Sequence, residues 1–180
     1  MPLTRLPIVG VMGSGEHEHA ECAEPLGRSL ADLGVHLLTG GGHGVMTSVS
    51  RAFVDVPSRR GLVLGIVPGT GDEATYTPRR GYPNLWVEVP IFTHLHRTGD
   101  QGGDRQSRNH INILSSHVII ALPGSMGTRS EVLLALRYHR PLVAHLTDRS
   151  QIPQLPSSVY VEPKLGSVIA FVQSHLGTDS

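Results

Sequence analysis

Short apolar runs, several of them ending in a glycine cluster, are the feature that most restricts how this chain can fold. The runs are rich in Val, Ile and Leu, and they alternate with longer segments in which apolar residues recur at helical spacing. Several runs are apolar on both faces, as in a buried parallel sheet. We expect strands at 6–12, 35–39, 62–67, 85–89, 117–121 and 141–145.

The segments between the strands carry apolar stripes that suit helices packed on a sheet. Such stripes occur in 26–33, where Pro25 either begins or kinks the helix, in 45–56 and in 165–176. The alternation of strand and helix is the pattern of βαβ units. At 180 residues the chain has the length of one domain. The sequence therefore predicts a single α/β domain over residues 1–180, a doubly wound parallel sheet with helices on both faces.

Overall charge and cysteine content argue against several classes of protein. The formal net charge is +0 and the pI is near 7.2, so the chain lacks the basic character of proteins held to nucleic acids or anionic membranes. The longest apolar runs, 62–68 and 118–123, are too short to span a bilayer. Cys22 stands alone, which excludes an internal disulfide and a cysteine zinc cluster. We expect a cytoplasmic protein with no nucleic-acid or membrane partner.

Three glycine clusters, at 13–15, 40–44 and 123–128, directly follow expected strands. The carboxyl ends of parallel strands flank the crevice where ligands bind, and helix N-termini there offer free N–H groups to anions. Glycines in any one cluster could also do no more than allow a tight turn, but three clusters together predict a phosphate-bearing ligand. The candidate residues are Gly13, Ser14, Gly41, Gly42, Gly44, Gly124, Ser125, Met126, Gly127 and Thr128.

These clusters do not match the common nucleotide-binding motifs. Glu18 occupies the position that would complete a G-x-G-x-x-G dinucleotide motif after Gly13, and the chain contains no G-K-[ST] sequence. We therefore expect neither NAD nor ATP as a cofactor.

The segment from Pro123 to Glu131 reads P-G-S-M-G-T-R-S-E, a turn that leads into a helix. Thr128 and Glu131 have the spacing of a capping box, which would explain both residues without any chemistry. Alternatively, Glu131 faces a hydroxyl of the ligand or acts as a general base beside a bound phosphate. The two roles are compatible.

A polar stripe with two arginines is expected upstream, on a helix over 104–116. Arg105, Arg108 and Asn112 would share one face of that helix. Guanidinium groups form paired hydrogen bonds with phosphate oxygens, so this stripe could serve the same ligand.

Two pairs of alternating histidines, at 17–19 and 94–96, could each reach a metal ion from an extended strand. The sequence places no third ligand near either pair, so we expect no metal site. Tyr82 and Trp86 could stack on a planar ring, and a core or subunit-contact role fits them equally well.

Four motifs together resemble the molybdenum cofactor carrier proteins. That group lies within the Rossmann-like superfamily of the Lonely Guy phosphoribohydrolases, whose members are often mislabelled as lysine decarboxylases. The motifs are G-V-M-G-S-G from Gly10, L-T-G-G-G-H-G-V-M from Leu38, S-R-N from Ser107 and P-G-S-M-G-T-R-S-E from Pro123, in the same order as in the carriers. The resemblance implies a Rossmann-like fold, a homodimer or homotetramer, and a phosphorylated small molecule at the carboxyl edge of the sheet.

The carrier group binds the molybdenum cofactor (molybdopterin), a pterin that bears one phosphate. The S-R-N sequence at 107–109 is similar to the carriers, which implies that Arg108 and Asn109 join the glycine residues at the ligand. We therefore expect a binding protein for the molybdenum cofactor or a related phosphate-bearing ligand.

The phosphoribohydrolases of the same superfamily imply an alternative. They cut the N-glycosidic bond of nucleoside 5′-monophosphates with an arginine and with the glutamate of a P-G-G-x-G-T-x-x-E motif, and Arg108 and Glu131 match these positions. Two departures separate this chain from them: Ser125 replaces the second glycine, and Asn109 stands where the hydrolases usually have lysine. A metabolite sensor without chemistry of its own is a third interpretation. The sequence does not decide between pterin and nucleotide, or between dimer and tetramer.

Overall fold

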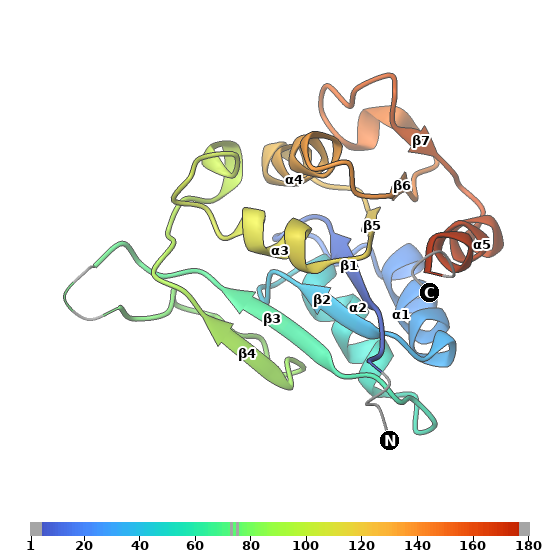
Figure 1. Cartoon of the computed structure of the whole chain (residues 1–180), viewed down its shortest axis with the longest axis horizontal. Helices are drawn as coiled ribbons and strands as arrows, with labels where there is room; N and C mark the ends of the chain where they lie inside the picture. The colour runs from blue at the N-terminus through green and yellow to red at the C-terminus, as the bar shows by residue number, and fades with distance from the viewer. Residues whose placement is uncertain (1–4, 73, 75, 177–180) are drawn as a thin grey trace.

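The apolar runs pair side by side into one parallel sheet, because buried strands need neighbours for their backbone hydrogen bonds. The computed structural model describes residues 5–72, 74 and 76–176. Within these residues seven parallel strands pair in the order β4-β3-β2-β1-β5-β6-β7 (Figure 1). They are β1 (Ile8–Met12), β2 (His36–Thr39), β3 (Val63–Val67), β4 (Val89–Phe92), β5 (Val118–Ala121), β6 (Leu142–Ala144) and β7 (Tyr160–Val161).

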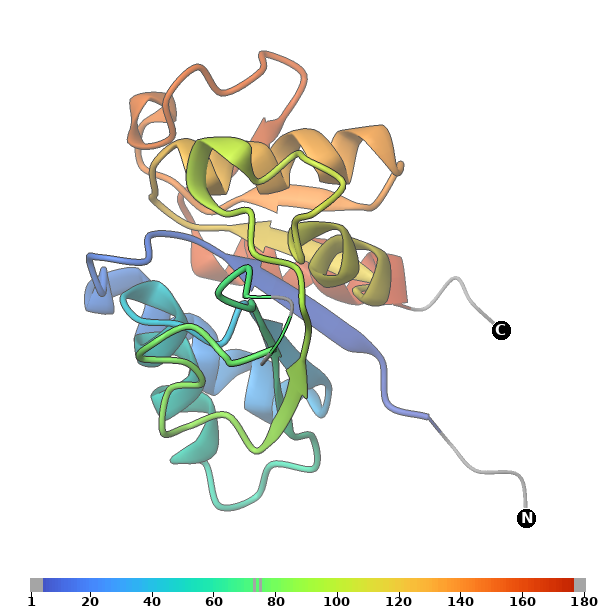
Figure 2. The same cartoon turned by 90° about the vertical axis from the view of Figure 1, so that its left-hand side faces the viewer.

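Helices cover both faces of this sheet (Figure 2). One face shares a core with α1 (Ala20–Leu33), α2 (Val45–Val54) and α5 (Leu165–Leu176), and the other with α3 (Asn109–Ser115) and α4 (Met126–Arg137). Alternate strand residues feed the two cores, as the period of a strand requires: Val118 and Ile120 pack in the first, Ile119 and Ala121 in the second. The predicted doubly wound, Rossmann-like α/β fold is confirmed. None of the helices within the described ranges is long and apolar enough to cross a membrane.

The order of the strands places a crevice at the centre of the sheet. The chain builds β1 to β4 outward in one direction and then returns, through α3, to start β5 on the other side of β1. β1 aligns Ile8 with His36 of β2, and Val9 with Val118 of β5. The loops after β1 and β5 lead to helices on opposite faces, so the carboxyl ends of these two strands flank an open crevice.

The strand expected at 85–89 is wrong over most of its length, since β4 begins only at Val89. The Asn84 side chain accepts a hydrogen bond from the N–H of Trp86 (3.0 Å), and the Asn84 carbonyl accepts one from the N–H of Val87 (3.3 Å). This local turn competes with strand pairing, so the strand begins later in the sequence than expected. The other five expected strands are confirmed, with ends that differ by at most two residues.

Two expected helices begin at other residues. The helix expected over 104–116 starts only at Asn109, because Asp104 closes two turns before it, one with its side chain and one with its carbonyl. α1 starts at Ala20, so Pro25 lies inside it. No predicted element corresponds to β7 or to the 3-10 helices η1 (Gly99–Gln101) and η2 (Arg149–Gln151).

Close contact between α1 and α2 depends on a glycine. A Cβ atom at Gly27 would lie 2.5 Å from the carbonyl oxygen of Val49 and 3.1 Å from the Cβ of Ala52. Protein interiors are close-packed, so an added atom there forces its neighbours to move. Gly27 therefore helps to set the position of α2, which follows the second glycine cluster.

We expect Gly27→Ala to lower the free energy of unfolding by about 1–3 kcal/mol, because the new methyl group overlaps backbone atoms of α2. Gly166→Ala in α5 is the matched control, since its added Cβ would meet no heavy atom of the described residues within 4 Å beyond its chain neighbours and the backbone of its own helix. Alanine favours a helix, so this control should stabilise the fold by up to about 1 kcal/mol. Urea denaturation measures both changes, and equal shifts would contradict the packing role of Gly27.

Candidate functional site

A cavity of about 270 Å³ opens at the crevice beside the carboxyl ends of β1 and β5. Its walls come from the end of β1 and the loop after it, the loop after β2 and the start of α2, the segment before α3, the first turns of α4, and a ring from the loop between β3 and β4. The lining residues are Val11, Met12, Gly13, Gly15, Glu16, Gly40, Met46, Tyr82, Thr98, Gly99, Arg108, Asn109, Ser125, Gly127, Thr128 and Glu131. Its volume is near the lower end of small-molecule sites, roughly 300 Å³.

The first turn of α4 brings free backbone donors to this cavity. Ser125 is the N-cap, and it has an extended backbone and no side-chain hydrogen bond to the helix. The first N–H groups of an α-helix lack partners inside the helix, and the helix dipole attracts anions to this end. Because Ser125, Gly127 and Thr128 line the cavity, these donors lie beside the space that a ligand would occupy.

The predicted capping box is wrong. α4 begins at Met126, so Thr128 lies inside its first turn and Glu131 in its second, and neither caps the helix. Both residues are buried, with exposed fractions of 2% and 8%, and both line the cavity. Their side chains are therefore placed for contact with a ligand.

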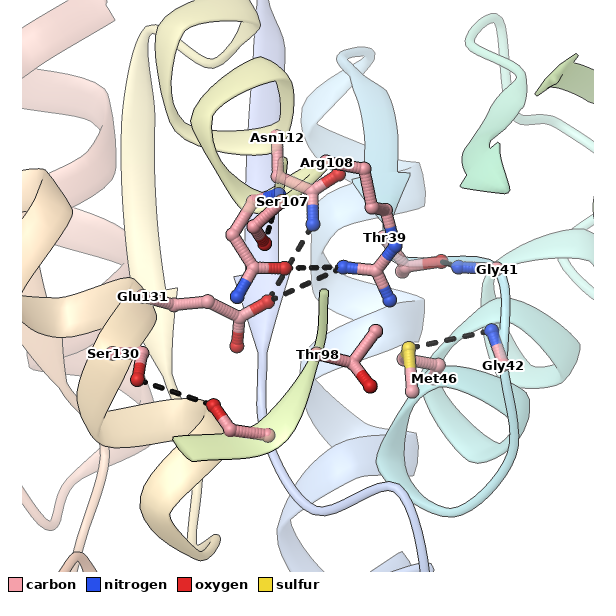
Figure 3. A network of polar contacts seen from close by, with 12 residues as sticks. Thr39, Gly41, Gly42, Met46, Thr98, Ser107, Arg108, Asn112, Ser130 and Glu131 are labelled. Atoms are coloured by element: carbon pink, nitrogen blue, oxygen red, sulfur yellow. Dashed lines mark hydrogen bonds and ion pairs between the residues drawn. The ribbon is translucent and has the colours of Figure 1, made fainter. Parts of the chain in front are cut away.

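Arg108 supplies positive charge at the cavity wall (Figure 3). Its side chain is 6% exposed, and its Nη1 donates to Asn109 Oδ1 at 2.5 Å and lies 3.9 Å from Glu131 Oε1. Its Nε has no hydrogen-bond partner among the described residues. Buried charge with unsatisfied donors is costly unless a partner is supplied. An anion in the cavity could therefore supply the partner that the guanidinium of Arg108 lacks.

Gly40 makes room for this arginine. A Cβ atom at position 40 would lie 2.4 Å from Nη2 of Arg108 and 3.0 Å from Sδ of Met46. Any other residue type would push the guanidinium from its place. The second glycine cluster thus contributes to the cavity because Gly40 leaves room for the guanidinium of Arg108 at its wall.

Glu131 lies beside Arg108 in the cavity wall. Its Oε1 accepts a long hydrogen bond from Nδ2 of Asn112 (3.5 Å), and the Asn112 Oδ1 has no partner among the described residues. Burial raises the pKa of the Glu131 carboxyl to about 7, while the charge of Arg108 and the hydrogen bond from Asn112 act in the opposite direction. The carboxyl therefore exchanges its proton near neutral pH, as a general acid or base does.

Ser14 fixes the shape of the first glycine loop. Its Oγ accepts hydrogen bonds from the N–H groups of Glu16 (3.1 Å) and His17 (3.0 Å), and its own N–H donates to the Pro123 carbonyl (2.9 Å). Ser14 is buried and does not line the cavity, whereas Gly13 does. Ser14 thus ties the first glycine loop to the third.

The second glycine loop uses its N–H groups internally. The N–H of Gly41 donates to the Thr39 hydroxyl (3.1 Å), and the N–H of Gly42 donates to the Met46 Sδ (3.3 Å). Gly44 is the N-cap of α2 with φ at 63°, a conformation that favours glycine. These three glycines do not line the cavity, and they shape the loop that holds Gly40 and Met46 at its wall.

The structure brings together seven of the predicted site residues. Gly13, Arg108, Asn109, Ser125, Gly127, Thr128 and Glu131 line the cavity, whereas Ser14, Gly41, Gly42, Gly44, Gly124 and Met126 do not. Arg105 is exposed and precedes α3, so it does not share a stripe with Arg108. Tyr82 lines the cavity, whereas Trp86 lines a separate pocket.

Several lining residues were missed by sequence reasoning. Gly40 and Met46 belong to the second glycine motif, whose spacing could have placed them beside the ligand. Thr98 and Gly99 lie in an irregular segment without periodicity, and no local pattern identifies them. Glu16 follows the first cluster and carries no pattern of its own.

The histidine pairs lie outside the cavity lining. His94 and His96 line a second pocket of about 250 Å³ together with Tyr76, and His17 contacts His19 edge to face. Among residues 5–72, 74 and 76–176, no group of three His, Cys, Asp or Glu side chains could hold a metal ion.

The shifted Glu131 makes stability depend on pH. Its folded-state pKa of about 7 exceeds the ordinary value of 4.5, so the folded chain binds more protons between these values and loses stability as the pH rises through them. We expect Glu131→Gln to remove this loss of stability. Above pH 7 its free energy of unfolding should exceed that of the wild type by up to about 3 kcal/mol. Urea denaturation across this pH window measures the difference, with exposed Asp32→Asn as control. Parallel profiles for Glu131→Gln and wild type would contradict the shift.

Known proteins resemble this chain in sequence and in structure. A molybdenum cofactor binding protein from Rippkaea orientalis is 29% identical, with a TM-score of 0.74 over 97% of this chain and 99% of that chain. The molybdenum cofactor carrier protein of Chlamydomonas reinhardtii is 28% identical, with a TM-score of 0.70 over 97% of this chain and 100% of that chain. An uncharacterized protein of Archaeoglobus fulgidus is 31% identical over 135 residues, which are 74% of this chain and 76% of its own length.

A family model gives the assignment. The model of the SLOG cluster4 family matches residues 6–170, from the residues before β1 into α5. All residues that line the cavity fall within this match. The resemblance to the Lonely Guy-type superfamily is thereby confirmed, and the chain belongs to the SLOG cluster4 family.

Proposed function

We propose that this chain binds the molybdenum cofactor, a pterin with one phosphate, and carries it without transforming it. The observation that carries this proposal is the meeting of two anion-binding devices in one cavity, the N-terminus of α4 and the buried Arg108. A phosphate at the first turn of α4 would accept hydrogen bonds from backbone N–H groups and from the Thr128 hydroxyl. Arg108 would offset its charge.

The remaining wall of the cavity fits a planar ring. Tyr82 adds an aromatic ring to the lining, and Met12 and Met46 add polarisable apolar surface. The two carrier and binding proteins named above, which superpose over almost the whole chain, support the molybdenum cofactor as the ligand. Together these features favour a phosphorylated pterin over inorganic phosphate alone.

Charge at the start of α4 tests the position of the phosphate. Aspartate is among the best N-cap residues, so Ser125→Asp should keep α4 folded while it places a negative charge beside the ligand. We expect its affinity for the molybdenum cofactor to fall roughly tenfold or more. Ser125→Asn has the same shape without the charge and should bind almost as the wild type does. Calorimetric titration with cofactor released from a molybdoenzyme compares them, and equal affinities of the two variants would contradict a phosphate at α4.

A nucleoside 5′-monophosphate phosphoribohydrolase is the second candidate, and one observation favours it. Glu131, with a pKa of about 7, lies 3.9 Å from Arg108 in the same cavity. A carboxyl of this kind could take a proton from an attacking water, and the guanidinium could promote departure of the base. Membership of the SLOG cluster4 family is consistent with both candidates.

Loss of the Glu131 carboxylate separates the two functions. A carrier should release no base from a panel of nucleoside monophosphates, and Glu131→Ala should still bind the molybdenum cofactor. Chromatography of free base and ribose 5-phosphate measures the reaction for wild type, Glu131→Ala and the closer mimic Glu131→Gln. Turnover by the wild type that falls by orders of magnitude in both variants would make this protein an enzyme and overturn the carrier proposal.

A further inference from the structure

One wall of the cavity is an irregular segment, residues 93–106, which we call the strap. The strap runs from the end of β4 through η1 toward α3, and it crosses the first turns of α4. Ser130 Oγ donates to the Gly99 carbonyl (3.2 Å), and a Cβ at Gly127 would lie 3.4 Å from the Gly99 Cα. Thr98 and Gly99 line the cavity from the strap. The strap therefore packs against the first turns of α4, and Thr98 lines the cavity beside the N-terminus of that helix.

An arginine from another loop fixes the strap. Arg79 donates from Nη1 to the Thr98 Oγ1 at 2.7 Å and from Nη2 to the His96 carbonyl at 3.0 Å. The backbone of Arg79 is also held, since its N–H donates to the Pro68 carbonyl and its carbonyl accepts from the N–H of Tyr82, both at 3.0 Å. A planar guanidinium bound at both ends has a defined orientation. The same turn thus presents Tyr82 to the cavity and holds Thr98.

The bond from Arg79 determines what the Thr98 hydroxyl can still do. A hydroxyl has one hydrogen to donate and two lone pairs, and a guanidinium can only donate. Arg79 therefore occupies a lone pair and leaves the hydroxyl hydrogen for another acceptor. Within the described residues this hydrogen has no acceptor of its own. Figure 3 shows the Thr98 side chain between Glu131 on one side and Met46 on the other.

We propose that Thr98 donates its hydroxyl hydrogen to a phosphate oxygen of the ligand, and that Arg79 is the positioning residue that orients this hydroxyl. The inference rests on the proposed function, since it requires a phosphate at the start of α4. The N–H donors of α4 and the hydroxyl of Thr98, which lies in the strap packed against that helix, bind oxygens of the same phosphate.

Titration calorimetry with inorganic phosphate tests the role of Thr98. Thr98→Val keeps the shape without the hydroxyl and should weaken binding roughly 10- to 100-fold, the effect of one hydrogen bond to a charged group. Thr98→Ser restores the hydroxyl and should bind within a few-fold of wild type. Arg97→Met is the control, because Arg97 bonds to the side chain of Gln101 in the same strap (2.9 Å) and should leave affinity unchanged.

A double variant tests the positioning role. Arg79→Met should weaken phosphate binding by less than Thr98→Val, and the combination of both should bind no more weakly than Thr98→Val alone, because Arg79 acts only through Thr98. Additive losses would overturn the role of Arg79. Equal phosphate affinity of wild type and Thr98→Val would overturn the role of Thr98 and leave the proposed function intact. A wild type that binds the molybdenum cofactor but no inorganic phosphate would overturn this inference and leave the proposed function intact, whereas a wild type that binds neither would overturn both.

Discussion

The burial of one positive charge is the constraint on which the rest of the site depends. A guanidinium that water hardly reaches must be held by hydrogen bonds and by opposite charge, or it destabilises the fold. Arg108 donates one short hydrogen bond to Asn109 Oδ1, its Nη1 lies 3.9 Å from Glu131 Oε1, and Gly40 leaves the space that the guanidinium fills. The protein offsets this charge only in part, which makes the cavity receptive to an anion.

The raised pKa of Glu131 would allow a carboxyl group and the proposed phosphate to share a cavity of about 270 Å³. Two negative charges in so small a cavity would repel each other, but a carboxyl with a pKa of about 7 readily takes up a proton near neutral pH, and its protonated form carries no charge and can donate a hydrogen bond. An anion at the start of α4 would favour the protonated form further. Arg108 would then serve the proposed ligand instead of the carboxylate, and the two acidic groups could share one site.

How much of this could be predicted from the sequence differs from element to element. Apolar spacing is local, so five of the strands and the helices α2 and α5 follow from it directly. The start of β4 does not, because the turn at Asn84 competes with strand pairing and leaves no mark in apolar periodicity. Arg108 and Glu131 belong to short motifs with fixed spacing and were identifiable for that reason. Thr98 was not, since its place depends on Arg79, a partner from a different loop.

The cavity walls come from segments that lie far apart along the chain, from Val11 to Glu131. An unfolded chain cannot bring these segments together, so a ligand that fills the cavity binds only the folded state and stabilises it by mass action. At a free ligand concentration a hundred times the dissociation constant, the free energy of unfolding rises by about 2.7 kcal/mol. The melting temperature of this protein therefore reports occupancy, whatever ring the ligand carries. Delivery of the cargo would leave behind a measurably less stable protein.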